Sequence, residues 1–285
     1  MRIFYFLFTL MISSHIKCSY AWHLTGHRIV AEIAQKNISS HTKKQLQFIL
    51  GSKDLASVAN WPDFVKSDKR WNFARHYHFA NTEKKTSYFQ SKKHEKGDIV
   101  SALYYFDHIL RSKTAKLKRK QVVLKYLVHC LGDMHQPLHL GRELDWGGNK
   151  IKIKYFNQET NLHVLWDKHM IVEYSLSYSE YAKKLGKLNA KQRSLTISGD
   201  YLTWAEESKL LVKDIYNYPG KSYRYEYAYR FRGTLEKQLQ RAGYRLAYAL
   251  DQIFKGHNLS EKFQQNKKSI LTKKRLQIYQ IKYPI

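Results

Sequence analysis

Apolar residues recur every three to four positions along most of this chain, which is the spacing of a helix face that packs on a core. The pattern predicts helices near residues 26–36, 40–50, 97–111, 118–135, 163–184, 196–216 and 230–255. One short stretch differs, because Ile151, Ile153 and Tyr155 alternate with lysines. Such alternation is typical of an extended chain, so we expect one short strand or hairpin within a mainly α-helical fold.

Residues 1–21 read as a secretory signal. Arg2 precedes an apolar run over residues 3–12, and small residues at Ser19 and Ala21 make a cleavage site. The run is too short for a stable membrane anchor. Cys18 offers a weaker lipoprotein alternative, because Lys17 before it does not fit that signal. We therefore expect a secreted or periplasmic protein.

The remaining chain reads as one domain with a basic tail. It contains only four prolines, and neither a low-complexity linker nor an internal repeat divides it. We expect one domain over residues 22–256. Residues 257–285 are a basic tail of unassigned structure, either a disordered arm or a flap over the surface.

Charge points to a polyanionic partner. The chain carries 50 Lys+Arg against 23 Asp+Glu, a formal net charge of +27. Such a field attracts polyanions and speeds their capture at low salt. Nucleic acid is the expected partner, and an acidic membrane surface is the competing one. Charge alone does not distinguish a protein that cuts nucleic acid from one that only binds it.

Residues 129–139, with the sequence HCLGDMHQPLH, concentrate side chains that bind metals. His129 and Asp133 are four residues apart, so they share one face of a helix. Pro137 ends that helix, and His139 can then approach the same point from another side. Nitrogen and carboxylate donors that converge in this way suit a zinc ion.

Two further groups of donors indicate more than one ion. His163 and Asp167 repeat the four-residue spacing. If the signal is cleaved, Trp22 begins the mature chain, and its free amine, with a pKa of about 7.7–8.0, can bind a metal. The carbonyl of Trp22 could close a chelate with that amine, and His27 lies five residues further along.

Together these segments resemble the S1/P1 family of zinc-dependent nucleases, which cleave single-stranded nucleic acid. The matching segments occur in order along nearly the whole mature chain. They are Trp22 with His27, WPD (61–63), HFAN (78–81), HCLGDMHQPLH (129–139), GGN (147–149), NLHVLWD (161–167), WAEES (204–208) and AGYRLAYAL (242–250). The combination is specific, whereas any one segment alone would be weak.

The resemblance implies a mainly α-helical, single-domain fold with three zinc ions in a cleft. The first ion would be held by Asp63, His78, His129 and Asp133. The second would be held by His139, His163 and Asp167. The third would be held by the amine and carbonyl of Trp22, by His27 and by a bridging Asp133. Zinc suits a set of nitrogen and oxygen donors without thiolate.

One ligand position is ambiguous. Residues 75–81 offer two His-aromatic pairs, His76 with Tyr77 and His78 with Phe79. The family's spacing from Asp63 favours His78.

The resemblance also implies an endonuclease that hydrolyses phosphodiester bonds of single-stranded DNA and RNA to 5′-phosphate products, with 3′-nucleotidase activity as a further expectation. Asp63 would be the catalytic residue that orients the attacking water. Lys66 stands where the family usually has an arginine, so it keeps the charge near the phosphate but loses the bidentate fork. Phe79 would stack on a base, Asn81 would read the base edge, and Asn149 would also contact substrate. No stable protein partner is implied, and a monomer is expected.

Two other functions compete with this one. A zinc phospholipase C family shares the fold and an N-terminal tryptophan ligand, but Phe79 and the order of the motifs favour the nuclease. A non-catalytic zinc or polyanion binder is the other alternative, and the intact Asp63 argues against it.

Cysteine usage is sparse. Cys18 leaves with the signal, so Cys130 is alone in the mature chain and no intrachain disulfide is possible there. Fungal and plant members of the resembled family are usually stapled by disulfides. We therefore expect a bacterial member in which bound metals take over that role, and a buried, inert Cys130.

Overall fold

The computed structural model describes residues 22–83 and 86–279 of the chain. The predicted signal at residues 1–21 therefore lies outside the described residues. Within the described ranges, no helix has both the length and the apolar character needed to cross a membrane.

Helices make up nearly all of the regular structure, as the apolar pattern predicts. In the first half they are α1 (Leu24–Asn37), α2 (Ser40–Leu50), α3 (Leu55–Val58), α4 (Trp61–Phe64), the 3₁₀ helices η1 (Val65–Ser67) and η2 (Lys69–His78), α5 (Ile99–Arg111), α6 (Leu117–Met134) and the 3₁₀ helix η3 (Pro137–Leu140). In the second half they are α7 (Leu162–Val164), the π-helical turn η4 (Leu165–His169), α8 (Met170–Val172), α9 (Tyr178–Lys184), α10 (Ala190–Ile197), α11 (Tyr201–Leu210), α12 (Val212–Tyr216), α13 (Tyr225–Lys255), α14 (Phe263–Ile270) and α15 (Lys273–Tyr279).

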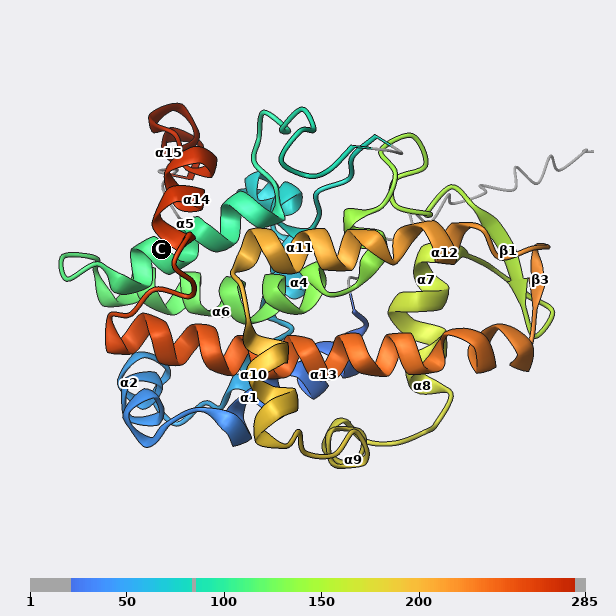
Figure 1. Ribbon diagram of the computed structural model, residues 1–285, viewed down its shortest axis with the longest axis horizontal. Coiled ribbons are helices and arrows are strands. Elements are labelled where there is room, and N and C mark those ends of the chain that lie inside the picture. Colours follow the sequence, from blue (N-terminus) through green and yellow to red (C-terminus); the bar gives the residue numbers. More distant parts are fainter. Residues whose placement is uncertain (1–21, 84–85, 280–285) are drawn as a thin grey trace, which may run out of the picture.

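The long helix α13 runs across the molecule, and α1 packs along it (Figure 1). Gly243 of α13 lies at this contact, where an added Cβ would meet the Cβ of Ile33 at 2.5 Å. Glycine therefore allows the two backbones to approach closely. Helices α5 and α6 pack together as a second pair, and α6 also contacts α1 and α13. The end of α6 is thereby held in the middle of the core.

A small sheet lies at one end of the molecule, beside the start of α13 (Figure 1). Strands β1 (Lys152–Tyr155) and β2 (Gln158–Asn161) form the predicted antiparallel hairpin. Phe156 and Asn157 make its two-residue turn with φ of 48° and 64°, the positive values that a tight hairpin turn requires. Strand β3 (Ser222–Tyr223) adds in parallel to β1. Two residues are too short a run to show a pattern, so β3 was not predicted.

The single helix expected over 163–184 is wrong. The chain there forms α7, η4 and α8, and then leaves the helical conformation at Ser175, where φ is 51°. Helix α9 starts afresh after Ser177, whose side chain forms a capping box with Glu180. This box satisfies free backbone donors at the new helix start. Apolar spacing continues across the break, which is why the pattern concealed it.

The helix expected over 196–216 is also divided. Helix α10 ends at Ile197, and Gly199 has φ of 94°, which ends the helical path. The Asp200 side chain then accepts hydrogen bonds from the backbone N–H groups of Leu202 and Thr203, which begins α11. A cap of this kind stabilises a helix start.

The chain beyond residue 256, left unassigned from the sequence, folds back on the domain. Helices α14 and α15 both contact α5. The hydroxyl of Tyr279 lies 2.6 Å from Ser101 Oγ, and Arg275 forms an ion pair with the buried Asp98 at the start of α5. The ring of Tyr279 also packs on Tyr77, next to His78. The C-terminal segment therefore supports the element that carries His78.

Arg275→Ala is expected to lower the free energy of unfolding by roughly 3–5 kcal/mol, because it leaves the buried Asp98 carboxylate without its cation. Denaturant titration would measure this change. Lys274→Ala, on the exposed side of the same helix, is the matched control and should leave stability within about 0.5 kcal/mol of the parent. Equal stability of the two variants would show that the C-terminal segment contributes nothing through this pair.

Candidate metal centre

Asp133, at the C-terminal end of α6, is fully buried and lies among three histidines. Its Oδ1 is 3.1 Å from His27 Nε2. Its Oδ2 is 2.9 Å from His78 Nδ1 and 3.2 Å from His129 Nε2. Helices α1 and α6 and the end of η2 thus bring their donors to one carboxylate. The two oxygens of Asp133 therefore face different histidines, which is the arrangement expected of a bridging ligand.

Asp63 joins this cluster from α4. Its Oδ1 is 3.6 Å from His129 Nε2 and 2.6 Å from Lys66 Nζ. Asp63, His78 and His129 together offer three donors that all lie within 4.8 Å of one another. His76 is not among them, because its ring stacks on His94 with 4.0 Å between ring centroids. The structure therefore brings His78 to the cluster and leaves His76 outside it.

A second cluster lies beside the first. His163 Nε2 is 3.1 Å from Asp167 Oδ2, and His139 Nε2 is 3.7 Å from Asp167 Oδ1. Gln136 donates from Nε2 to the same Oδ1 at 2.5 Å, which orients the carboxylate. His139 comes from η3, just after Pro137, and the π-helical turn η4 carries Asp167.

Backbone carbonyl groups orient three of these histidine rings. His129 Nδ1 lies 2.7 Å from the oxygen of Ala59, and His139 Nδ1 lies 2.5 Å from the oxygen of His78. His163 Nδ1 lies 2.6 Å from the oxygen of Gly147. A carbonyl only accepts, so each Nδ1 carries a proton and each Nε2 faces the cluster. This is the usual outer contact of a metal-binding histidine.

The donor set fits metal ions. Zinc–ligand bonds of about 2.0–2.2 Å in a tetrahedron place neighbouring donors roughly 3.3–3.6 Å apart, close to the separations of 2.9–3.7 Å found here. In addition, several buried donor atoms have no hydrogen-bond partner among the described residues. They are His27 Nε2, Asp133 Oδ1, His139 Nε2 and Asp167 Oδ2. Orphaned buried polar atoms are costly unless an ion satisfies them.

Trp22 is fully buried and holds the start of the described chain against this centre. Its indole Nε1 donates to the oxygen of Gly132 at 2.6 Å, and the next residue, His23, donates from its backbone to the oxygen of Asp167 at 2.8 Å. Gly132 also allows the ring of His27 to approach, because an added Cβ would lie 3.0 Å from His27 Nδ1. The first described residue thus lies between the two clusters.

The ionisable groups perturb one another strongly. Burial alone would lower the pKa of His139, but Asp133 and Asp167 outweigh it and raise that pKa to about 9. Burial and the nearby Lys66 lower the pKa of His78 to about 3. Burial favours a protonated Asp133, yet His129 and His27 hold its pKa well below the usual range. The carboxylate is therefore ionised and His78 is neutral, and these are the protonation states in which both bind metals.

A cleft of about 370 Å³ opens over the two clusters. All four predicted substrate contacts, Lys66, Phe79, Asn81 and Asn149, line it together with His78, His139 and His163. Asn81 Oδ1 is buried without a described partner, so an acceptor is available in the wall.

Three residues that line this cleft, Arg75, Leu138 and Trp146, were not among the predicted site residues. Arg75 donates to the backbone oxygen of Lys66 at 3.3 Å, so it lies beside that lysine. Trp146 is 63% exposed, has φ of 55°, and lies with its ring 4.3 Å from Lys150 Nζ. Its position directly before residues 147–149 was the signal that could have identified it.

Fold and site define the class: a helical protein whose buried histidines and aspartates suit metal ions beneath a cleft. The sequence model of the S1/P1 nuclease family matches residues 22–255. Endonuclease 3 of Arabidopsis thaliana is 32% identical over 86% of this chain and 93% of its own length. Nuclease S1 of Aspergillus oryzae is 32% identical over 82% of this chain and 92% of its own length. Nuclease P1 of Penicillium citrinum is 28% identical over 81% of this chain and 97% of its own length.

The chain therefore belongs to the S1/P1 nuclease family. This membership confirms the resemblance, the mainly helical fold class and the predicted class of enzyme, a nuclease. Cys130 is buried and free, and burial raises the pKa of its thiol, so the residue is inert at neutral pH.

Proposed function

We propose that this protein is a secreted, zinc-dependent endonuclease that hydrolyses phosphodiester bonds in single-stranded DNA and RNA, leaves 5′ phosphates, and also removes phosphate from 3′-nucleotides. The observation that carries the proposal is the buried Asp63, which contacts Lys66, a residue that lines the cleft. One of its oxygens contacts Lys66, and the other is buried without a described hydrogen-bond donor. That second oxygen can accept a hydrogen bond from the attacking water.

Three zinc ions are part of the proposal. Asp63, His78, His129 and Asp133 would hold the first, and His139, His163 and Asp167 the second. Trp22, His27 and the bridging Asp133 would hold the third. Zinc bound there supplies charge stabilisation for the phosphate and lowers the pKa of water.

Asp63 would orient the attacking water. Its carboxylate is held by Lys66 and by the helical turn of α4, so the accepting oxygen has a defined direction. Burial opposes ionisation, but His129 and Lys66 hold the pKa of Asp63 below its usual value. An ionised acceptor is therefore present at neutral pH.

Two cations would bind the phosphate. Lys66 supplies a compact charge, and Arg75 supplies a planar guanidinium at the same wall of the cleft. A guanidinium can donate two parallel hydrogen bonds to a phosphate, which an ammonium cannot. Arg75 would thus supply the paired hydrogen bonds to phosphate that Lys66 cannot make.

Phe79, Asn81 and Trp146 would bind the base. Stacking on an aromatic ring tolerates every base, which agrees with a weak sequence preference. Asn81 Oδ1 can accept a hydrogen bond from a base amino group, and Asn149 would hold the loop that carries Trp146, since its Nδ2 donates to the Trp146 oxygen at 2.8 Å. Bases paired in a duplex are not available for stacking, so single strands are favoured.

The test is digestion of matched single-stranded and duplex DNA, of RNA, and of a 3′-nucleotide by zinc-loaded protein that begins at Trp22. Cutting of single strands with 5′-phosphate ends is the expected result. A lecithin emulsion is the control substrate for the phospholipase alternative. Hydrolysis of lecithin without cleavage of nucleic acid would overturn the proposal.

Trp146→Ala is expected to raise KM for single-stranded DNA about 5- to 150-fold, with a smaller effect on kcat, because a stacked base contributes about 1–3 kcal/mol. Steady-state kinetics on a short oligonucleotide would measure it. Leu144→Ala is the matched control, since Leu144 is 90% exposed on the same loop but does not line the cleft. An equal KM in both variants would remove Trp146 from the substrate site.

A further inference from the structure

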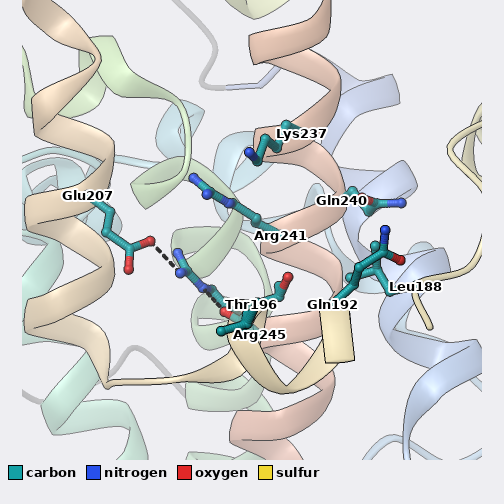
Figure 2. Close-up of a pocket in the computed structure, with 9 residues that line it drawn as sticks. Leu188, Gln192, Thr196, Glu207, Lys237, Gln240, Arg241 and Arg245 are labelled. Atoms are coloured by element: carbon teal, nitrogen blue, oxygen red, sulfur yellow. Dashed lines mark hydrogen bonds and ion pairs between the residues drawn. The ribbon is translucent and has the colours of Figure 1, made fainter. Parts of the chain in front are cut away.

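A second pocket lies between α10, α11 and α13 and shares no lining residue with the cleft (Figure 2). Its volume is about 380 Å³, within the range of roughly 300–1,000 Å³ typical of ligand pockets. Nine residues line it: Leu188, Gln192, Leu195, Thr196, Glu207, Lys237, Gln240, Arg241 and Arg245. Nothing in the proposed cleavage reaction uses it.

Three cations face this pocket from one side of α13. Lys237, Arg241 and Arg245 follow one another at intervals of four residues, so they share a helix face. Figure 2 shows all three side chains leaving α13 on the side that faces α11. Three like charges in a row destabilise one another unless anions compensate them.

Arg245 is the buried member of this row of cations. It is almost fully buried, donates from Nε to the oxygen of Thr196 at 2.8 Å, and pairs with Glu207. Its Nη1 also lies 3.1 Å from His135 Nε2, so the pocket floor adjoins the segment that carries the metal-binding residues. Burial and the charge of Arg241 lower the pKa of Arg245 to about 10 despite Glu207. The pocket therefore already carries an excess of positive charge.

Lys237 and Arg241 remain without a compensating acid. Glu207 is engaged by Arg245, and no carboxylate of a described residue lies within salt-bridge distance of Lys237 or Arg241. The side chain of Arg241 makes one hydrogen bond, to Gln238 Oε1 at 3.2 Å, which leaves most of its donors available. Two cations with free donors at one pocket mouth suit a compact dianion.

The other walls favour an anion that carries an organic group. Leu188 and Leu195 are apolar, and Leu195 is 69% exposed on α10. Gln192 adds an amide at the same rim. A phosphate group bound by the cations would direct an attached sugar or base toward these two leucines.

We propose that this pocket is a separate binding site for a phosphate monoester, with Lys237 and Arg241 as the donors and Arg245 as the buried support. Free phosphate and a nucleoside monophosphate share the required chemistry, and the leucines favour the nucleotide. This site binds its ligand without cleaving it, so it is independent of the proposed nuclease activity.

Isothermal titration calorimetry of the metal-loaded protein with inorganic phosphate, with adenosine 5′-monophosphate and with adenosine tests the proposal. We expect a phosphate-dependent site in addition to any at the metal centre. Lys237→Ala/Arg241→Ala should weaken that additional site about tenfold or more, since it removes both charged hydrogen-bond donors. Arg230→Ala/Lys255→Ala removes the same charge from exposed positions of the same helix outside the pocket and should retain the site.

Tighter binding of the nucleotide than of inorganic phosphate would support the role of the leucines, and equal binding would support free phosphate as the ligand. Equal affinities in the two double variants would overturn the site. Binding of adenosine as tightly as its monophosphate would overturn the phosphate chemistry. Calorimetry does not require cleavage, so failure here is distinct from failure of the nuclease proposal.

Discussion

Asp63→Asn is expected to reduce cleavage of single-stranded DNA roughly 100- to 10,000-fold, the range typical of removing a positioned proton acceptor. The amide keeps the shape of the side chain but loses its charge, and one of its two terminal atoms becomes a donor. An amide donor facing the position of the attacking water would repel the proton that the carboxylate oxygen accepts. Single-turnover rates of the metal-loaded variant would measure the loss.

Two measurements separate orientation of water from loss of a ligand, because Asp63 is proposed for both roles. If the variant retains its full metal content, the loss of rate reports on orientation. If the variant has lost one ion, the loss of rate reports on the role of Asp63 as a metal ligand. Glu159→Gln makes the same chemical change at an exposed position of β2 and should cleave at the parental rate. Parental activity in a fully metal-loaded Asp63→Asn variant would falsify the assignment.

Removal of metal is expected to abolish cleavage and to lower the melting temperature by about 10 °C or more. A structural zinc site binds with roughly 10–16 kcal/mol in small peptides, and about 1 kcal/mol corresponds to roughly 2–4 °C in a domain of this size. Here the ions would satisfy the orphaned oxygens of Asp133 and Asp167, which are buried. Differential scanning calorimetry before and after chelation would test this.

Restoration by different ions is the control for chelation. Zinc should restore both activity and stability, with about three ions bound per chain by elemental analysis. Magnesium and calcium should not, because they prefer sets of oxygen ligands to these histidines. An unchanged melting temperature in fully metal-free protein would show that the centre does not contribute to folding.

Much of the metal centre was accessible from the sequence. Pairs four residues apart, such as His129 with Asp133 and His163 with Asp167, face the same way in an α-helix, so their spacing predicts a shared site. In the structure these pairs lie 3.2 Å and 3.1 Å apart. Pro137 likewise ends the helix as expected, and His139 approaches from η3.

The helix breaks, two cleft residues and the long-range contacts could not be predicted from the spacing of apolar residues. Apolar spacing runs through residues 173–177 and 198–200, so the breaks between helices were hidden until the positive φ of Ser175 and Gly199 appeared. Arg75 is an exposed residue of the 3₁₀ helix η2, and Trp146 is an exposed residue in a turn, so the α-helical period carries no information about either. The packing of Tyr279 on Ser101 joins residues 178 positions apart.

The sequence by itself therefore determined the helical class, the hairpin, the family and which side chains can bind metals, because each depends on residue type and short-range spacing. The resemblance already implied that Asp133 is a shared ligand, and the structure adds the contacts of its two oxygens with His27, His78 and His129. Only the tertiary structure decided that α14 and α15 pack on α5 and that Gln136 orients Asp167. It also decided that Trp146 faces the cleft and that the row of cations on α13 lines a separate pocket. These features arise where distant segments meet, and packing of the core, rather than local spacing, sets which segments meet.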